Sequence, residues 1–241
     1  MAASRLLRCD DRTDLVTETA TRLVAAMSAR QAEGGSVSLC LTGGVLANDV
    51  YAAMAQQADD LQASEIHLWW NWDYYIATDN PDRNSLQALS RLAGVLALDP
   101  AKIHPIPSSS ATTDAEVGAA QYANELLESA PIDICLLELG SQGQIAGLFP
   151  QQAIPGSPDP VIGIVDAQAA YSELITLTPS GLNSCQEIWI LASGEAVARH
   201  LKEIFEQNPD QPGSHLKQSE SLLWLVDNAA TTQLGFHHCS L

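Results

Sequence analysis

A loop rich in glycine and glutamine follows an apolar run at residues 132–137, which the pattern predicts to be a buried strand. In α/β proteins, ligands bind in the loops at the carboxyl ends of such strands. The polar side chains of this loop include Gln142 and Gln144, which alternate with Gly140 and Gly143. A glutamine amide can hydrogen-bond to water but cannot take its proton near neutral pH. The loop therefore has the position of an active-site loop but lacks an acid–base group.

A second candidate loop, Thr42-Gly43-Gly44, joins a predicted strand at 36–41 to a predicted helix at 47–58. Free backbone N–H groups at such a turn, with the helix dipole behind them, form a cradle that binds phosphate. The alternative is a tight connection, because glycine turns the chain at little steric cost. A lone Gly-Gly pair does not separate the two interpretations, so these three residues are candidate ligand-binding residues.

A third candidate is the polar segment 79–84, which ends in Arg83 and Asn84. Arg83 is one of only three lysine or arginine residues between positions 31 and 198. Charge-assisted hydrogen bonds from arginine are strong contacts for an anion, so we expect Arg83 to hold any anion that binds, with Asn84 beside it. The alternative is an ion pair with Asp79 or Asp82 that stiffens the loop.

The elements that must position these loops alternate between helix and strand along the whole chain. Apolar residues at helical or strand-like spacing predict helices over 12–33, 47–58, 85–98, 114–130, 195–206 and 220–230, and strands over 36–41, 65–75, 132–137, 161–165, 174–177 and 188–192. Such alternation is typical of α/β proteins with a wound, mainly parallel sheet. No segment reads as a linker, so we expect one domain over residues 1–241.

Composition narrows the classes of partner. The formal net charge is −18, so clustered cations for nucleic acid or an anionic membrane surface are not expected. The chain has no apolar run of about eighteen residues and no signal-peptide pattern at its start, which predicts a cytoplasmic protein. Its cysteines lack metal-like spacing, and the neighbouring His237, His238 and Cys239 are expected to be a frayed tail rather than a metal site.

Several segments together resemble the 6-phosphogluconolactonase family. They occur in the family's order between about residues 36 and 227, and they read LTGG, HLWW, DNPDRN, KIHPIP, IDICLLELGSQGQIAGLFP, ELITLTPSGLN, IWILASGE and LLWLVD. The combination favours the lactonase over its relative, glucosamine-6-phosphate deaminase. The resemblance implies a three-layer αβα sandwich and hydrolysis of the 6-phosphogluconate δ-lactone in the pentose phosphate pathway. It implies no metal and no organic cofactor.

The expected pocket departs from the family pattern at five positions. The resemblance places an aspartate and a histidine base where Gln142 and Gln144 stand. It places cations where this chain has three uncharged residues, namely Tyr74, Leu174 and Val197. Losing a general base typically costs about 10² to 10⁴ in rate, and a phosphate dianion without cations loses its strongest contacts.

Three functional hypotheses follow from these departures. The first is a lactonase-family protein with impaired or lost catalysis, which then serves as a binding or regulatory protein with a protein partner. The second is a working lactonase in which Glu138 or Asp73 supplies the base, while Arg83 and the amides of Gly43 and Gly44 hold the phosphate. The third is a hydrolase of a different, uncharged lactone. The ligand expected in each case is a sugar lactone or a sugar phosphate.

Overall fold

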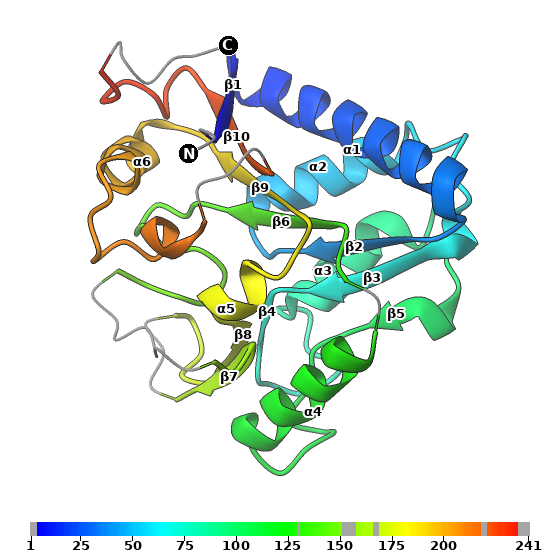
Figure 1. Ribbon diagram of the computed structural model, residues 1–241. Coiled ribbons are helices and arrows are strands. Elements are labelled where there is room, and N and C mark those ends of the chain that lie inside the picture. Colours follow the sequence, from blue (N-terminus) through cyan, green and yellow to red (C-terminus); the bar gives the residue numbers. More distant parts are fainter. Residues whose placement is uncertain (1–3, 130, 151–157, 166–168, 218–220, 236–241) are drawn as a thin grey trace.

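A computed structural model describes residues 4–129, 131–150, 158–165, 169–217 and 221–235. The predicted tail group at 237–239 lies outside these residues. The centre is a parallel sheet of seven strands (Figure 1), in the order β1 (Arg5–Cys9), β10 (Leu222–Asp227), β9 (Glu187–Ala192), β6 (Ile134–Glu138), β2 (Val37–Leu41), β3 (Ile66–Trp70) and β5 (Ile103–His104). Strands covered on both faces read as continuous apolar runs, and β2 and β10 are buried at every position.

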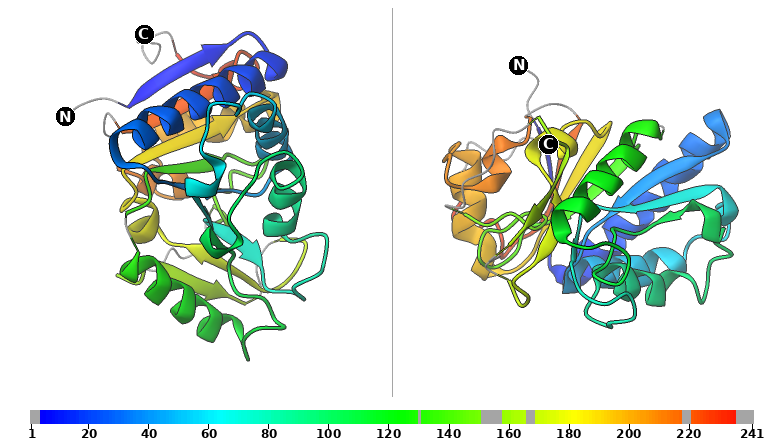
Figure 2. Two further views of the ribbon diagram at one scale, coloured as in Figure 1. Left: turned by 90° about the vertical axis from the view of Figure 1, so that its right-hand side faces the viewer. Right: turned by 90° about the horizontal axis from the view of Figure 1, so that it is seen from below.

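Helices cover both faces of this sheet, which gives the predicted three-layer αβα architecture. On one side lie α1 (Arg12–Gly34), α2 (Val45–Ala55) and α3 (Asn84–Leu92). On the other side lie α5 (Pro179–Leu182) and α6 (Ala198–Phe205), as the views in Figures 1 and 2 show. In the described ranges, the elements are joined by the 3-10 turns η1 (Ala63–Glu65), η2 (Pro100–Lys102), η3 (Glu195–Val197) and η4 (Pro212–His215).

A second, smaller sheet lies beside the central one. It is antiparallel, in the order β4 (Trp72–Tyr74), β8 (Leu174–Leu177) and β7 (Val161–Ile164), and α4 (Ala115–Glu128) packs against β7 and β8. The single strand predicted over 65–75 is therefore two strands, β3 and β4, which belong to different sheets. The break is at Asn71, whose side-chain amide donates to the Leu136 carbonyl over 2.6 Å. The chain therefore passes from the central sheet to the small sheet at Asn71.

The helix predicted over 220–230 is wrong. Residues Leu222–Asp227 form strand β10, which pairs in parallel with both β9 and β1. All six of its residues are buried, as in a strand covered on both faces. A short continuous apolar run does not distinguish a buried strand from a buried helix, because neither leaves a polar face to reveal a period. Strands β1 and β5 were not predicted.

No helix among the described ranges is both long enough and apolar enough to cross a membrane.

Candidate ligand site

The candidate loops come together at the carboxyl ends of β2 and β6. These two strands are parallel neighbours, with Cys40 opposite Cys135, so the loops that follow them emerge side by side. A Cβ atom on Gly44 would overlap the Glu138 carboxylate, and one on Gly43 would overlap the Asn84 amide. A side chain at either position would therefore displace the Asn84 or Glu138 side chain, and Gly44 also has a φ of 132° that disfavours other residues.

The amino end of α2, predicted to cradle phosphate, is occupied by a carboxylate of the same chain. Glu138 Oε2 accepts a hydrogen bond from the backbone N–H of Ala47 over 2.9 Å. A carboxylate at this place satisfies a helix N–H that has no partner within the helix, and it also interacts favourably with the helix dipole. A phosphate at the same amides would have to displace Glu138 or sit against its negative charge.

Glu138 is also the carboxyl group of this site that can exchange a proton near neutral pH. Burial raises the pKa of Glu138 from its usual 4.5 to about 7, and the hydrogen bond from Ala47 only partly opposes this effect. A carboxyl with such a pKa at the end of a strand has the protonation behaviour of a general base. Glu138 is therefore the stronger of the two substitute bases proposed from the sequence.

Asp73, the other substitute base, is enclosed in a buried ion pair with Arg83. Its Oδ2 lies 2.9 Å from Arg83 Nη2 and 3.0 Å from Nε, and it accepts from the Ser85 hydroxyl over 2.7 Å. Its Oδ1 accepts from the Asn84 backbone N–H over 2.7 Å. Burial raises the pKa of Asp73, while the Arg83 charge and these hydrogen bonds lower it. With both oxygens engaged and the side chain fully buried, Asp73 is badly placed to take a proton from water.

The same geometry bears on Arg83 as an anion ligand. Arg83 is only 2% exposed, and its guanidinium also donates to the Ile106 carbonyl. It lies at the expected end of the sheet, but its hydrogen-bonding groups point to Asp73 rather than to a ligand. The geometry favours the ion-pair alternative, although the partner is Asp73 instead of Asp79 or Asp82.

The glutamine loop closes on itself. The Gly143 N–H donates to the Gly140 carbonyl over 2.9 Å, and the Gly140 N–H donates to the Gln144 carbonyl over 3.0 Å. Gln144 Oε1 accepts from the Gln142 backbone N–H over 3.0 Å, and the same side chain fills the space beside Gly140. The side-chain amide of Gln144 therefore stabilises the turn.

Of the three positions where the resemblance implied cations, Leu174 and Val197 are buried and Tyr74 is partly exposed. Tyr74 and Leu174 are directly opposite each other on β4 and β8. Leu174 is fully buried in a cluster with Leu148 and Ile164, against which Tyr74 packs. Val197 is 3% exposed in the main core. Leu174 and Val197 therefore lie among apolar side chains, where a lysine or arginine without a partner would be costly to bury.

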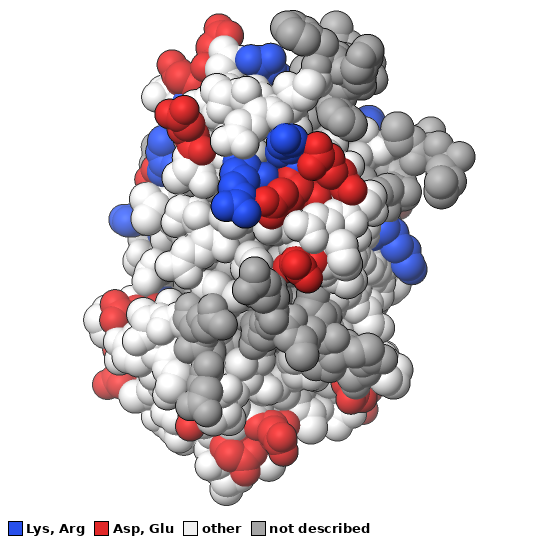
Figure 3. Space-filling view, turned by 90° about the vertical axis from the view of Figure 1, so that its left-hand side faces the viewer, with Lys and Arg blue, Asp and Glu red and all other residues white. Residues whose placement is uncertain are grey.

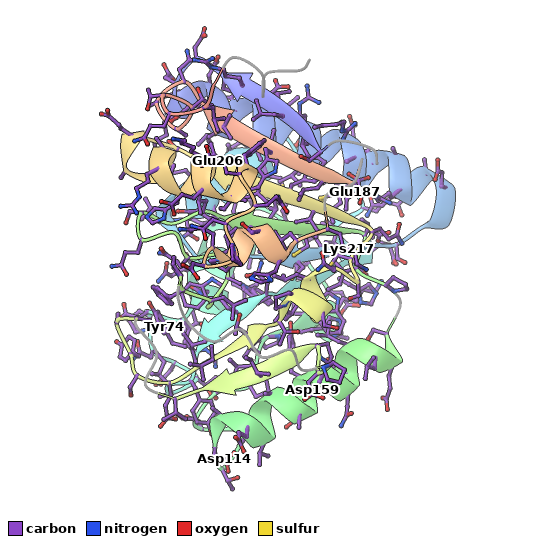
Figure 4. All side chains as sticks on the ribbon, turned by 60° about the vertical axis from the view of Figure 1, so that its left-hand side comes forward. Tyr74, Asp114, Asp159, Glu187, Glu206 and Lys217 are labelled. Atoms are coloured by element: carbon purple, nitrogen blue, oxygen red, sulfur yellow. The ribbon has the colours of Figure 1, made fainter. Side chains whose placement is uncertain are left out.

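A cavity of about 310 Å³ opens beside Tyr74. Figure 4 labels Tyr74, which is the last residue of β4. The cavity is lined by aromatic, amide and small side chains, namely Trp72, Tyr74, Phe149, Gln142, Gln144, Ala146, Ala169 and Ala170. It therefore joins the glutamine loop to the aromatic face of β4. In the parts of the chain that are described, no group of three His, Cys, Asp or Glu side chains could hold a metal ion.

Sequence reasoning missed a polar group from α6 and η4 that packs beneath the glutamine loop. A Cβ atom on Gly143 would lie 2.5 Å from His200 Nδ1. The amide nitrogen of Gln211 lies 3.2 Å from the same Nδ1 and donates to Glu203 over 2.6 Å. An amide nitrogen only donates, so His200 Nδ1 is an acceptor that is already engaged. His200 stands alone in a helical pattern, and no spacing rule distinguishes it.

We expect Asp73→Asn to lower the free energy of unfolding by about 3 to 5 kcal/mol, because it leaves the buried Arg83 charge without its partner. Urea denaturation at neutral pH measures this loss. Asp79→Asn, at an exposed position on the same loop, is the matched control and should change stability little. Equal effects of the two substitutions would contradict the structural role of the ion pair.

Glu138 predicts a specific dependence of stability on pH. The pKa of Glu138 in the folded protein is about 7, above its usual 4.5. Its contribution to the free energy of unfolding is therefore fully present below about pH 4.5 and is lost as the pH rises through 7. Between pH 5 and 8, the wild-type protein should lose up to about 3 kcal/mol relative to Glu138→Gln, which does not titrate. Urea denaturation across this range gives the difference. The exposed Glu128→Gln is the control, and a pH-independent difference for Glu138→Gln would refute the raised pKa.

Comparison with known proteins agrees with this architecture. The family model described as glucosamine-6-phosphate isomerases/6-phosphogluconolactonase matches residues 10–224. A 6-phosphogluconolactonase of Streptomyces coelicolor is 31% identical, with 93% of this chain and 92% of that protein covered. One of Synechocystis is 33% identical, with 89% and 90% covered. The crystal structure of 6-phosphogluconolactonase from Thermotoga maritima superposes with a TM-score of 0.83 at 20% identity, over 93% of this chain and 99% of that one. The chain therefore belongs to the glucosamine-6-phosphate isomerase/6-phosphogluconolactonase family.

Proposed function

We propose that this family member has impaired or lost hydrolysis of 6-phosphogluconolactone, the reaction that the names of its relatives indicate. The observation that carries the proposal is the direct pairing of Tyr74 with Leu174 inside an apolar cluster. Those are two of the three positions at which the family resemblance implies cations. By the same proposal, the protein descends from a cytoplasmic enzyme of the pentose phosphate pathway.

The chemistry of lactone opening supports this proposal. Water must add to the carbonyl carbon while a base takes its proton, and the ring oxygen must leave and be protonated. Gln142 and Gln144 can orient water but cannot accept a proton, and Gln144 is already engaged in closing its own turn. The loss of such a base lowers rates by about 10² to 10⁴.

The contacts available to a phosphate also support impaired hydrolysis. The helix N–H of Ala47 is already bonded to Glu138, and Arg83 is bonded to Asp73. A phosphate dianion would therefore find the Ala47 N–H and the Arg83 guanidinium already engaged, in a protein with a net charge of −18. Charged ligands need charge-assisted contacts to offset their loss of hydration.

A second candidate function is retained lactone hydrolysis with Glu138 as the base. It is favoured by one observation, the pKa of about 7 for a carboxyl group at the carboxyl end of β6. That carboxylate must leave its hydrogen bond to Ala47 to reach a water molecule, or act on a water molecule through its other oxygen. A binding or regulatory role without catalysis belongs to the proposal of lost hydrolysis. Activity measurements separate it from the second.

A coupled assay with freshly made 6-phosphogluconolactone, corrected for spontaneous opening, tests the proposal. Under the same conditions, we expect the wild-type rate to be at least about 100-fold below that of the Streptomyces coelicolor relative. The double variant Gln142→Asp with Gln144→His should restore a small rate, and adding Tyr74→Arg should raise it further by positioning the phosphate. Tyr74 is suited to this change because it is partly exposed, whereas Leu174 is fully buried.

The control for these variants is Gln56→Ala, at an exposed position near the far end of α2. It should leave the rate unchanged. The proposal fails if the wild-type protein matches the relative. If Glu138→Gln then abolishes that activity, the second candidate, with Glu138 as the base, is correct.

A further inference from the structure

The aromatic rings of β4 form a row on one face of the strand. Successive side chains of a strand point to opposite faces, so Trp72 and Tyr74 share a face while Asp73 points into its buried ion pair. The Trp72 and Tyr74 rings meet nearly at right angles, with centroids 5.1 Å apart and an interplanar angle of 82°. Tyr171 continues the row at 5.0 Å from Tyr74. The row has no place in the lactonase chemistry discussed above.

The cavity beside this row combines aromatic faces with amide groups. Trp72, Tyr74 and Phe149 contribute rings, and Gln142 and Gln144 contribute amides. The turn holds Gln144 in place through its hydrogen bond from the Gln142 backbone. Aromatic faces beside amide groups that both donate and accept hydrogen bonds suit a ring that carries hydroxyl groups.

The charge around the cavity disfavours an anion. Every lining side chain in the described ranges is neutral. The Tyr171 hydroxyl next to Tyr74 donates to Asp82 over 2.6 Å, which puts a carboxylate at the end of the aromatic row. On the face shown in Figure 3, the charged side chains near the lower end are acidic, whereas acidic and basic ones occur together in the upper part. A phosphorylated ligand would therefore meet repulsion rather than capture.

We propose that this cavity binds a single uncharged sugar ring or its lactone. The C–H face of such a ring can pack on the Trp72 or Tyr74 ring, whose face carries partial negative charge. Its hydroxyl groups can exchange hydrogen bonds with the glutamine amides, which both donate and accept. No carboxylate lines the described part of the cavity to neutralise a cationic ligand. The inference rests on the proposed loss of phosphate recognition and adds the class of ligand that replaces the sugar phosphate.

The size of the cavity agrees with one ring. Its volume of about 310 Å³ is at the lower end of the roughly 300 to 1,000 Å³ that small-molecule sites span. A ligand of this size, held without charged contacts, is expected to bind with a dissociation constant of about 1 mM.

Paired ligands that differ only in charge test the proposal. We would measure binding of D-glucose and D-glucose 6-phosphate by saturation-transfer NMR, and would add freshly dissolved glucono-1,5-lactone as the uncharged lactone. Both uncharged ligands should bind saturably, and D-glucose should bind at least about tenfold more tightly than its 6-phosphate, which carries the disfavoured charge.

Substitutions in the cavity should change the binding of these ligands. Tyr74→Leu removes an aromatic face but keeps the apolar packing, and should weaken D-glucose binding about tenfold. Tyr74→Arg adds a cation and should shift the preference toward the 6-phosphate. Gln142→Ala, at an exposed position, should weaken D-glucose binding without affecting folding, while Gln56→Ala should leave binding unchanged. Unfolding curves for each variant confirm that the fold is intact.

Three results would overturn the proposal: no saturable binding of any uncharged ring, tighter binding of the 6-phosphate by the wild-type protein, or D-glucose binding that Tyr74→Leu and Gln142→Ala leave unchanged. The result is separable from that for lactonase activity. Rapid hydrolysis of 6-phosphogluconolactone by the wild type would refute the proposed function, whereas an inactive protein that binds no uncharged ring would refute only the present inference.

Discussion

The buried carboxylate of Asp73 is the interaction on which the geometry of this site depends. A lone charge in the interior would be very costly, and the Arg83 guanidinium together with the backbone N–H of Asn84 compensates it. These bonds tie β4 to the start of α3. Because Asp73 points inward, Trp72 and Tyr74 on either side must point to the opposite face. One ion pair thereby fixes both the entry to α3 and the aromatic wall of the cavity.

The fold could be predicted from the sequence wherever one physical signal dominates. Apolar runs of strand length predicted β2, β6, β8 and β9, because strands covered on both faces leave no polar alternation. The same lack of a period made β10 look like a helix. The division of 65–75 into β3 and β4 was not predictable, because it depends on the long-range hydrogen bond from Asn71 to Leu136.

The positions of the candidate loops were predictable, but the contacts of their side chains were not. Sequence places Gly43, Arg83 and Gly143 after strand-like runs, and a parallel sheet brings such loops to one edge. That Arg83 pairs with Asp73 rather than with a neighbour on its own loop depends on the turn between the two sheets. The contact of Glu138 with the amino end of α2 likewise depends on the register of β2 against β6.

The contact of Glu138 with α2 and the apolar cluster around Leu174 both fit a site that no longer binds a phosphate. A helix amino end favours an anion, and in this chain a side chain of the protein provides it, so the site needs no external phosphate to satisfy Ala47. Once the phosphate is absent, a cation at Leu174 would be a buried charge without a partner, and leucine becomes the more stable residue there. Each loss therefore favours the other. Without the phosphate a buried cation destabilises the protein, and without the cations a phosphate has few partners. For this reason, a single restored cation in the core would destabilise the protein before it improved binding.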